Sequence, residues 1–183
     1  MKPKLILING NPGMGKSTLA ERYTNEHPLT LNLDVDRIWH MMGQWQTMLD
    51  ESHRLKQKHS YALAESHLAE GYDVVVPNLM ETVDRPEKFE RIAKLHGALF
   101  REVALVTSPE DAIERCKARA RRMGYEDGFR PGGVLDTHGR ELKLAEMYQN
   151  MLAVTALRTQ TVQIQPELGD LEGTYQHFLS AIA

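Results

Sequence analysis

The sequence contains a single cysteine, Cys116, among its 183 residues. An internal disulfide is therefore excluded, and the chain suits a reducing compartment. The sequence also lacks any apolar run long enough for the core of a signal peptide or for a membrane span. We therefore expect a cytoplasmic protein without a membrane partner.

The chain has no excess of positive charge. Its 22 lysine and arginine residues stand against 25 acidic residues, which gives a formal net charge of −3. This balance provides no overall attraction to nucleic acid, so nucleic acid is not an expected partner. Hydrophobic residues make up 42% of the chain, as in ordinary globular proteins, and the length is that of one domain.

Several motifs of other enzyme classes are missing. No H-x-x-x-H pair is present, so a structural zinc site is not expected. No G-x-S-x-G nucleophile elbow occurs, and the glycines near the N-terminus lack the spacing of a dinucleotide-binding loop. The absence of an N-K-x-D sequence argues against a guanine-specific switch.

Five short apolar runs alternate with helical segments. We predict strands at 5–8, 29–33, 73–77, 100–106 and 161–165. We predict helices from residue 17, over most of 35–70, at 86–96, 109–122 and 137–156, and from residue 171. This alternation predicts a parallel sheet with helices on both faces. Ligands of such sheets bind beyond the carboxyl ends of the strands, which here are followed by Gly10, Asp34, Asn78 and Thr107.

The first predicted strand leads into a complete G-x-x-x-x-G-K-[ST] motif. A chance glycine turn is the alternative, but the motif stands between a strand and a helix, as a phosphate-binding loop must. Its backbone N–H groups are expected to converge on phosphate oxygens, Lys16 to reach the β- and γ-phosphates, and Ser17 to coordinate Mg²⁺. The predicted nucleotide-binding residues are Gly10, Asn11, Pro12, Gly13, Met14, Gly15, Lys16, Ser17 and Thr18.

The chain resembles the P-loop kinase group, the small nucleoside- and nucleotide-kinase-like, AAA-type ATP-binding proteins. The resemblance rests on the P-loop, on the stretch Leu33–Ile38, and on the stretch Val103–Asp111 that leads into Arg115-x-x-x-Arg119. Polynucleotide kinase, zeta toxin and chloramphenicol phosphotransferase belong to this group. The resemblance implies a three-layer α/β/α P-loop NTPase fold with five parallel strands in the order 2-3-1-4-5, and ATP and Mg²⁺ as cofactors.

The same resemblance implies a single kinase-like domain over 1–183, with a mobile lid around 119–135 and an acceptor-covering helical segment around 37–70. It makes Asp36 the candidate general base, because the carboxylate after the second strand faces the phosphate acceptor in such kinases. Asp34 is the candidate metal ligand or shares the base role. Helix capping is the alternative for both, since aspartate is a favoured N-cap residue. Arg37 is a candidate for binding an acceptor phosphate, with a solvated surface arginine as the alternative.

Three arginines share one face of the helix predicted at 109–122, namely Arg115, Arg119 and Arg122. Their forked donors suit phosphate, and the resemblance makes Arg119 a catalytic residue that stabilises transferred charge. A solvated basic helix end is the alternative. Glycines at 124, 128, 132 and 133 would permit a lid to close.

The third strand departs from the pattern of many P-loop proteins, because it ends at Asn78 without an acidic residue. Asn78 is a weak candidate for binding a ligand, with turn formation as the alternative. Trp39 and His40 are weak candidates for an acceptor pocket because they lie next to Asp36.

These residues predict an ATP-dependent phosphotransferase with a small-molecule hydroxyl or phosphate acceptor. Two alternatives remain open: a nucleotide-switched module that acts through a partner, and a kinase for nucleic-acid ends. The sequence does not specify the acceptor, the choice between ATP and GTP, or the oligomeric state.

Overall fold

The computed structural model describes residues 2–131, 133–167 and 169–183. Within them, five parallel strands form one sheet in the order β2-β3-β1-β4-β5. The strands are β1 (Lys4–Asn9), β2 (Leu31–Asn32), β3 (Val74–Pro77), β4 (Leu99–Leu105) and β5 (Val162–Ile164). The predicted fold class and strand order are confirmed.

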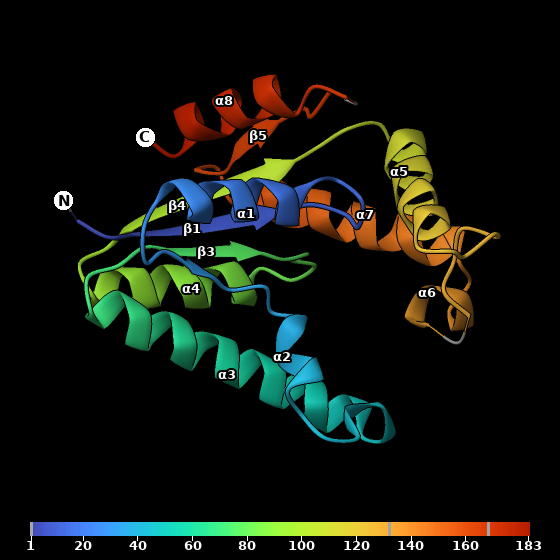
Figure 1. The fold of residues 1–183 in the computed structure, drawn as a ribbon, viewed down its shortest axis with the longest axis horizontal. Coiled ribbons are helices and arrows are strands. Elements are labelled where there is room, and N and C mark those ends of the chain that lie inside the picture. The colour runs from blue at the N-terminus through green and yellow to red at the C-terminus, as the bar shows by residue number, and fades with distance from the viewer. Residues whose placement is uncertain (1, 132, 168) are drawn as a thin grey trace.

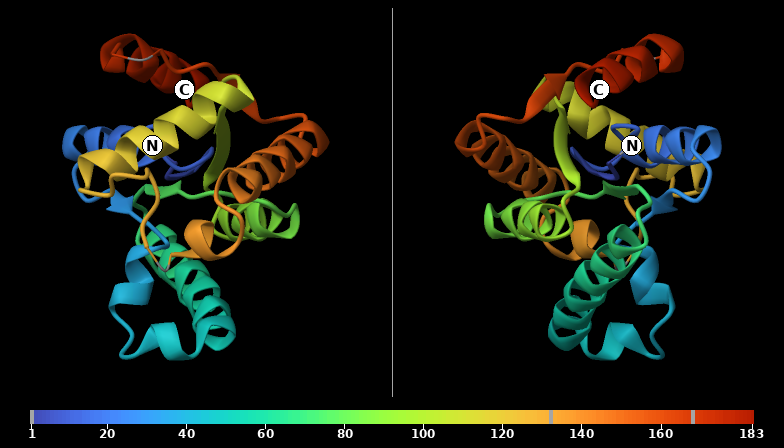
Figure 2. Two further views of the ribbon diagram at one scale, coloured as in Figure 1. Left: turned by 90° about the vertical axis from the view of Figure 1, so that its right-hand side faces the viewer. Right: turned by 90° about the vertical axis from the view of Figure 1, so that its left-hand side faces the viewer.

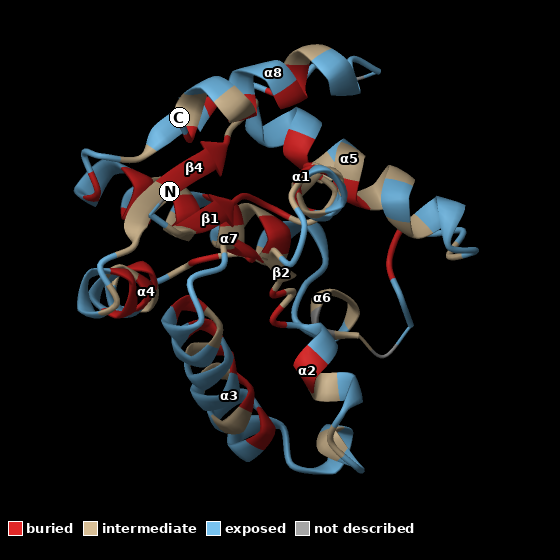
Figure 3. Cartoon of the chain, turned by 60° about the vertical axis from the view of Figure 1, so that its left-hand side comes forward, coloured by how far each residue is buried: buried red, intermediate tan, exposed pale blue. Residues whose placement is uncertain are grey.

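The central strand β1 pairs with β3 on one side and β4 on the other. Its residues Leu5 to Ile8 are fully buried because helices cover both faces of the sheet. Ile6 and Ile8 belong to one core cluster, and Leu5 and Leu7 belong to the other. Figure 3 shows this burial concentrated in the strands.

Helices form a layer on each side of the sheet. Helices α1 (Lys16–Glu26) and α8 (Leu171–Ala181) supply apolar side chains to one core cluster, and α3 (Leu49–Ala69) and α4 (Asp84–Leu95) supply them to the other. Helix α7 (Glu141–Leu157) supplies Tyr148 and Met151 to the same core cluster as α1 and α8. Figure 2 looks along the strands and shows helices on both sides of the sheet.

The carboxyl ends of the strands point toward a second group of helices. Helices α5 (Pro109–Arg122) and α6 (Val134–Thr137) lie beyond the arrowheads of β1 and β4 (Figure 1). Helix α2 (Arg37–His40) and the 3-10 turn η1 (Trp45–Thr47) lie near the same end, beside the first turns of α3. Helix α5 begins as predicted, with Ser108 Oγ accepting the Asp111 N–H at 3.1 Å.

Three predicted boundaries are wrong, each for a local reason. The second strand is shorter than 29–33, because Leu29 has a positive φ of 64° and cannot extend the pairing. The predicted helical stretch 35–70 is divided into α2, η1 and α3 at Gln44, whose φ is 49°. Helix α7 begins at Glu141 rather than 137, after a turn with positive φ at Gly139 and Arg140.

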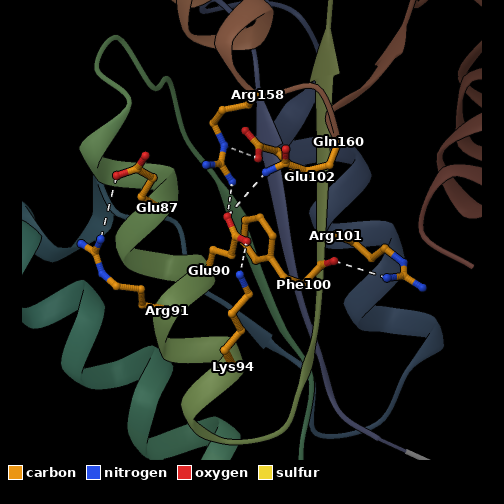
Figure 4. Close-up of polar contacts among 9 residues, drawn as sticks. All are labelled: Glu87, Glu90, Arg91, Lys94, Phe100, Arg101, Glu102, Arg158 and Gln160. Carbon is orange, nitrogen blue, oxygen red and sulfur yellow. Dashed lines mark hydrogen bonds and ion pairs between the residues drawn. The ribbon is translucent and has the colours of Figure 1, made fainter.

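A buried ion pair joins the sheet to α4 and to the end of α7 (Figure 4). Arg158 Nε donates to Glu102 Oε2 at 2.6 Å, and Arg158 Nη2 donates to Glu90 Oε2 at 2.7 Å. Arg158 and Glu102 are only 5% and 4% exposed. Burial raises the pKa of Glu102, whereas the bond from Arg158 opposes that rise. The exposed Lys94 pairs with Glu90 at the solvent-facing side of this network.

In the part of the chain that the structure describes, no helix is both long enough and apolar enough to cross a membrane.

We expect Arg158→Met to lower the free energy of unfolding by about 3–5 kcal/mol at neutral pH, because it leaves the Glu102 carboxylate buried without its cation. The folded-state pKa of Glu102 lies above its unfolded value, so the ionised form disfavours folding and protonation relieves it. The loss of stability should therefore shrink as the pH falls. Urea denaturation at pH 7.5 and pH 5 measures both effects.

The matched control is Lys94→Met, in the same network but with a side chain that is 71% exposed. Its effect should stay below about 1 kcal/mol. Equal losses for the two variants, or a larger Arg158→Met loss at pH 5, would contradict the assignment of Glu102 and Arg158 as a buried ion pair.

Candidate functional site

The glycine-rich loop connects the carboxyl end of β1 to the first turn of α1. Gly15 precedes the helix with a φ of 91°, and Lys16 is its first residue. Lys16 Nζ donates to the carbonyl oxygens of Gly10 at 2.6 Å and Asn11 at 2.9 Å. The loop therefore wraps around this ammonium group, at the edge of the sheet where ligands of parallel sheets bind. Ser17 and Thr18 are exposed at the helix start, where their backbone N–H groups are among those left without intrahelical partners.

Gly13 brings this loop into direct contact with the backbone of α5. A Cβ atom at Gly13 would lie 2.7 Å from the carbonyl carbon and oxygen of Arg115 and 2.9 Å from the nitrogen of Cys116. The φ of Gly13 is +86°, which also favours glycine. The neighbouring Met14 is buried in the core and anchors the loop from the other side. The loop and the arginine-bearing helix therefore pack as one unit.

Two arginines of α5 lie over the loop. Arg119 and Arg122 line a cavity of about 210 Å³ together with Gly13, Gly15, Lys16, Ser17 and Thr18. Burial, followed by the positive charge of Arg119, lowers the pKa of Lys16 to about 8, while Asp36 and Asp34 oppose the shift. This density of positive charge is suited to a polyphosphate.

Arg115 occupies a different position from the other two arginines. Its Nη2 donates to the carbonyl oxygen of Pro166 at 2.8 Å. It lines an adjoining cavity of about 200 Å³, which also shares Gly13 and Gly15 with the first. The loop between β5 and α8 forms the other wall through Pro166, Glu167 and Asp170. The sequence analysis missed this loop, because no local motif marks it.

The two predicted carboxylates point to different partners. Asp34 Oδ1 accepts the backbone N–H of Asp36 at 3.1 Å, and Asp34 Oδ2 lies 3.6 Å from Arg37 Nε. Asp36 Oδ1 accepts from Lys56 Nζ at 2.9 Å, and the Asp36 side chain is 66% exposed. Asp34 therefore stabilises the turn into α2. Asp36 exposes its carboxylate to solvent at the carboxyl edge of the sheet, which we call the rim.

Lys56 is a site residue that the sequence analysis missed. Its side chain is only 4% exposed, and its ammonium lies 3.3 Å from the ring centroid of Trp39. Burial lowers the pKa of Lys56, and Asp36 opposes that shift. The signal available in the sequence was the spacing of α3, in which Lys56 falls on the same buried face as Ser52, Ser60, Ala64 and Leu68.

The weak candidates near Asp36 are mostly engaged with each other or with neighbouring elements. Trp39 stacks on Trp45 with ring centroids 5.0 Å apart, and His40 contacts the edge of Trp45. Arg37 is 64% exposed and donates to Glu21 of α1 at 3.2 Å. The aromatic residues thus form a packed cluster beside Lys56.

Asn78 lies at the same edge as the loop. Its backbone N–H donates to the carbonyl oxygen of Ile8 at 3.0 Å, which places it beside the start of the glycine-rich loop. The Asn78 side chain is buried, and its Nδ2 atom has no hydrogen-bond partner among the described residues.

The candidate metal ligands are a hydroxyl and a carboxylate, Ser17 and Asp34. Across residues 2–131, 133–167 and 169–183, no group of three or more His, Cys, Asp or Glu side chains could hold a metal ion. A dedicated protein cage for a cation is therefore not found in that part of the chain.

The predicted lid follows α5 as a loop that folds back on it. Gly128 packs against Lys117, and Phe129 is 5% exposed. Gly133 accepts a hydrogen bond from Thr137 Oγ1, while Gly132 lies outside the described residues. Closure of this segment stays a prediction.

A protein-family model described as an AAA domain matches residues 5–140 of the chain. No curated protein matches the chain. Solved structures do match, at identities that show the fold alone.

Three of these structures illustrate the likeness. The APS kinase CysC of Mycobacterium tuberculosis, in complex with AMPPNP and APS, is 17% identical with a TM-score of 0.59, over 98% of this chain and 97% of that one. A chain of the Pnkp1/Rnl/Hen1 RNA repair complex is 16% identical with a TM-score of 0.60; the match covers 85% of this chain but only 46% of that one. A chain from the PezAT toxin–antitoxin system of Streptococcus pneumoniae is 19% identical with a TM-score of 0.58, over 79% and 65% of the two chains.

The lowered pKa of Lys16 predicts a pH dependence of ADP binding. The ammonium loses its charge as the pH rises through about 8, and a polyphosphate binds the charged form more tightly. The affinity for ADP should therefore fall above that pH, by at most about tenfold per pH unit, and binding should take up protons. Calorimetry between pH 7.5 and 9.5, in two buffers of different ionisation enthalpy, measures both quantities.

Lys16→Arg is the control, because a guanidinium stays charged throughout this range. Its affinity for ADP, whatever its absolute value, should not vary with pH in this way. A wild-type affinity that is constant from pH 7.5 to 9.5 would rule out Lys16 as the titrating phosphate ligand.

Proposed function

The chain belongs to the AAA domain family and has the kinase-like P-loop fold that the sequence resemblance implied, and from this we propose that it is an ATP-dependent phosphotransferase. Its acceptor is a small molecule with a hydroxyl group. The chain acts as one kinase-like unit in the reducing cytoplasm, which its single buried thiol suits.

One observation carries the proposal: the glycine-rich loop, Lys16 and the two arginines Arg119 and Arg122 of α5 line one cavity at the carboxyl end of β1. Arg119 lowers the pKa of Lys16, while Asp36 and Asp34 raise it, so all three side chains act on the same ammonium. A triphosphate in the cavity lined by Lys16, Arg119 and Arg122 would be neutralised by cations along its length. Its terminal phosphate would then point toward Asp36, where an acceptor can approach.

The adjoining cavity is suited to the nucleoside end of ATP. It opens from Gly13 and Gly15 toward Arg115 and the loop at Pro166 and Glu167. The arginine guanidinium offers a planar surface on which a purine ring can stack. A kinase of the same fold, CysC, has been solved with the ATP analogue AMPPNP, which supports ATP as the nucleotide.

The chemistry of two oxygen donors, one on α1 and one after β2, suits Mg²⁺. The Ser17 hydroxyl and the Asp34 carboxylate are hard oxygen donors, and Mg²⁺ usually keeps several waters and binds through few protein ligands and the substrate phosphates. We assign these two residues to the ion. When bound, Mg²⁺ would neutralise charge on the phosphate oxygens.

Asp36 is the proposed general base, and Lys56 is the residue that positions it. The Asp36 carboxylate is exposed at the rim, yet the buried Lys56 ammonium fixes one of its oxygens at 2.9 Å. The acceptor hydroxyl gives its proton to Asp36 while its oxygen bonds to the γ-phosphorus. The bond from that phosphorus to the β–γ bridging oxygen breaks, and ADP leaves. Arg119 stabilises the transferred charge, and closure of 119–135 excludes water.

We expect Asp36→Asn to lower kcat for phosphate transfer by about 10²–10⁴-fold with little change in the affinity for ATP, because the amide cannot accept the proton. Lys16→Ala should abolish transfer by removing the main phosphate ligand. ADP release from Mg-ATP, measured with and without a panel of hydroxyl and phosphate acceptors, tests both variants.

Asp50→Asn is the matched control, since Asp50 is an exposed aspartate at the start of α3 outside the cluster around Lys56. It should retain wild-type turnover. Full activity of Asp36→Asn would contradict its role as a base and would indicate an acceptor that is already ionised, such as a phosphate.

A further inference from the structure

Asn78 lies between the two halves of the proposed reaction site. It directly follows β3, and β3 is the strand between β1, which leads into the glycine-rich loop, and β2, which leads to Asp34 and Asp36. The Asn78 N–H donates to the carbonyl oxygen of Ile8, two residues before Gly10. Asn78 therefore lies at the carboxyl edge of the sheet, between the start of the glycine-rich loop and the turn that carries Asp34 and Asp36.

The orientation of the Asn78 amide is fixed by a backbone donor. The N–H of Leu79 donates to Asn78 Oδ1 at 2.8 Å. If the amide were flipped, its NH₂ group would face the Leu79 N–H, and two donors would oppose each other. The oxygen therefore accepts from Leu79, and the nitrogen is the atom without a partner. Asn78 is 8% exposed, and Nδ2 is buried without a partner among the described residues. A buried donor without a partner is unfavourable, and a ligand can supply the missing acceptor.

A second asparagine holds this position in place relative to the loop. Asn9, which is 1% exposed, accepts both the Gly10 N–H at 2.9 Å and the Met80 N–H at 2.8 Å through its Oδ1. The segment after β3 and the start of the glycine-rich loop are thus joined by a single side chain. The Asn78 donor is consequently preorganised before any ligand binds.

The chemistry of the donor decides its partner. An amide N–H donates a hydrogen bond, so Asn78 Nδ2 cannot act as a carboxylate that accepts hydrogen bonds or binds a cation. It needs an oxygen that accepts, and the anionic oxygens of a terminal phosphate lie at this point of the proposed reaction.

We infer that Asn78 Nδ2 donates a hydrogen bond to the terminal phosphate of the bound nucleoside triphosphate, and so distinguishes the triphosphate from the diphosphate. This inference rests on the proposed function, because it takes the direction of the triphosphate from it. During transfer, the same donor stabilises charge on the phosphoryl oxygens.

The test compares the affinities for AMPPNP and ADP, measured by calorimetry with Mg²⁺ present. Asn78→Ala should weaken AMPPNP binding by roughly tenfold or more, as expected for a hydrogen bond to a charged group, and leave ADP binding within about twofold. Asn32→Ala is the matched control: Asn32 is an asparagine on the neighbouring strand β2 that also carries a buried amide atom without a partner. It should leave the ratio of the two affinities unchanged.

Asn78→Asp keeps the test decisive if the alanine variant folds poorly. Its carboxylate still accepts the Leu79 N–H, but it replaces the donor by a negative charge. AMPPNP binding should then weaken at least as much as in Asn78→Ala. An unchanged ratio of AMPPNP to ADP affinity in a folded Asn78 variant would overturn the inference.

The comparison of AMPPNP and ADP affinities does not depend on whether the protein transfers phosphate. A wild-type protein whose preference for AMPPNP over ADP depends on Asn78, but which transfers phosphate to no acceptor, would retain the inference and lose the proposed function. A wild-type protein that transfers phosphate while its Asn78 variants keep the wild-type ratio would lose the inference alone.

Discussion

The contact between Gly13 and the backbone of α5 determines the geometry of the whole site. The glycine-rich loop lies so close to the carbonyl of Arg115 that a Cβ atom would come within 2.7 Å of it. Because the two backbones touch, the side chains of Arg119 and Arg122 extend over the loop and share a cavity with Lys16. The lowered pKa of Lys16 follows from its burial and from Arg119. In the proposed function, a bound polyphosphate would relieve this accumulation of positive charge.

The second constraint is the parallel sheet, which brings residues far apart in the sequence to one edge. Asn78 reaches the phosphate loop through β3, and Asp36 lies one strand further along. Both are held by side chains from elsewhere: Asn9 joins the segment after β3 to the loop, and Lys56 reaches across from α3 to Asp36. The rim thus carries cations on one side and a carboxylate on the other, with an amide donor between them. In the proposed reaction, this polarity would orient phosphate transfer from the loop toward Asp36.

Local patterns predicted the glycine-rich loop and the capped start of α5, because each depends on neighbouring residues. The strand order is not local, and it was predicted only through the resemblance to P-loop kinases. The predicted end of the second strand failed, since the positive φ of Leu29 is not apparent from its apolar side chain. Lys56 was missed for a different reason. The helical spacing of α3 places it on a buried face. Its role, however, depends on the packing of α3 against α2, which brings its ammonium within 3.3 Å of the Trp39 ring centroid, and spacing alone does not predict that contact. The wall formed by Pro166 and Glu167 was missed likewise, because it meets Arg115 only in the folded chain.

The most direct test of the central claim is ³¹P NMR of Mg-ATP incubated with the protein and a mixture of small hydroxyl compounds. Phosphate transfer predicts a new phosphate-ester signal that grows in step with ADP and depends on an acceptor. Growth of inorganic phosphate alone at a rate that no acceptor changes would contradict the account, and would indicate a hydrolysing switch rather than a kinase.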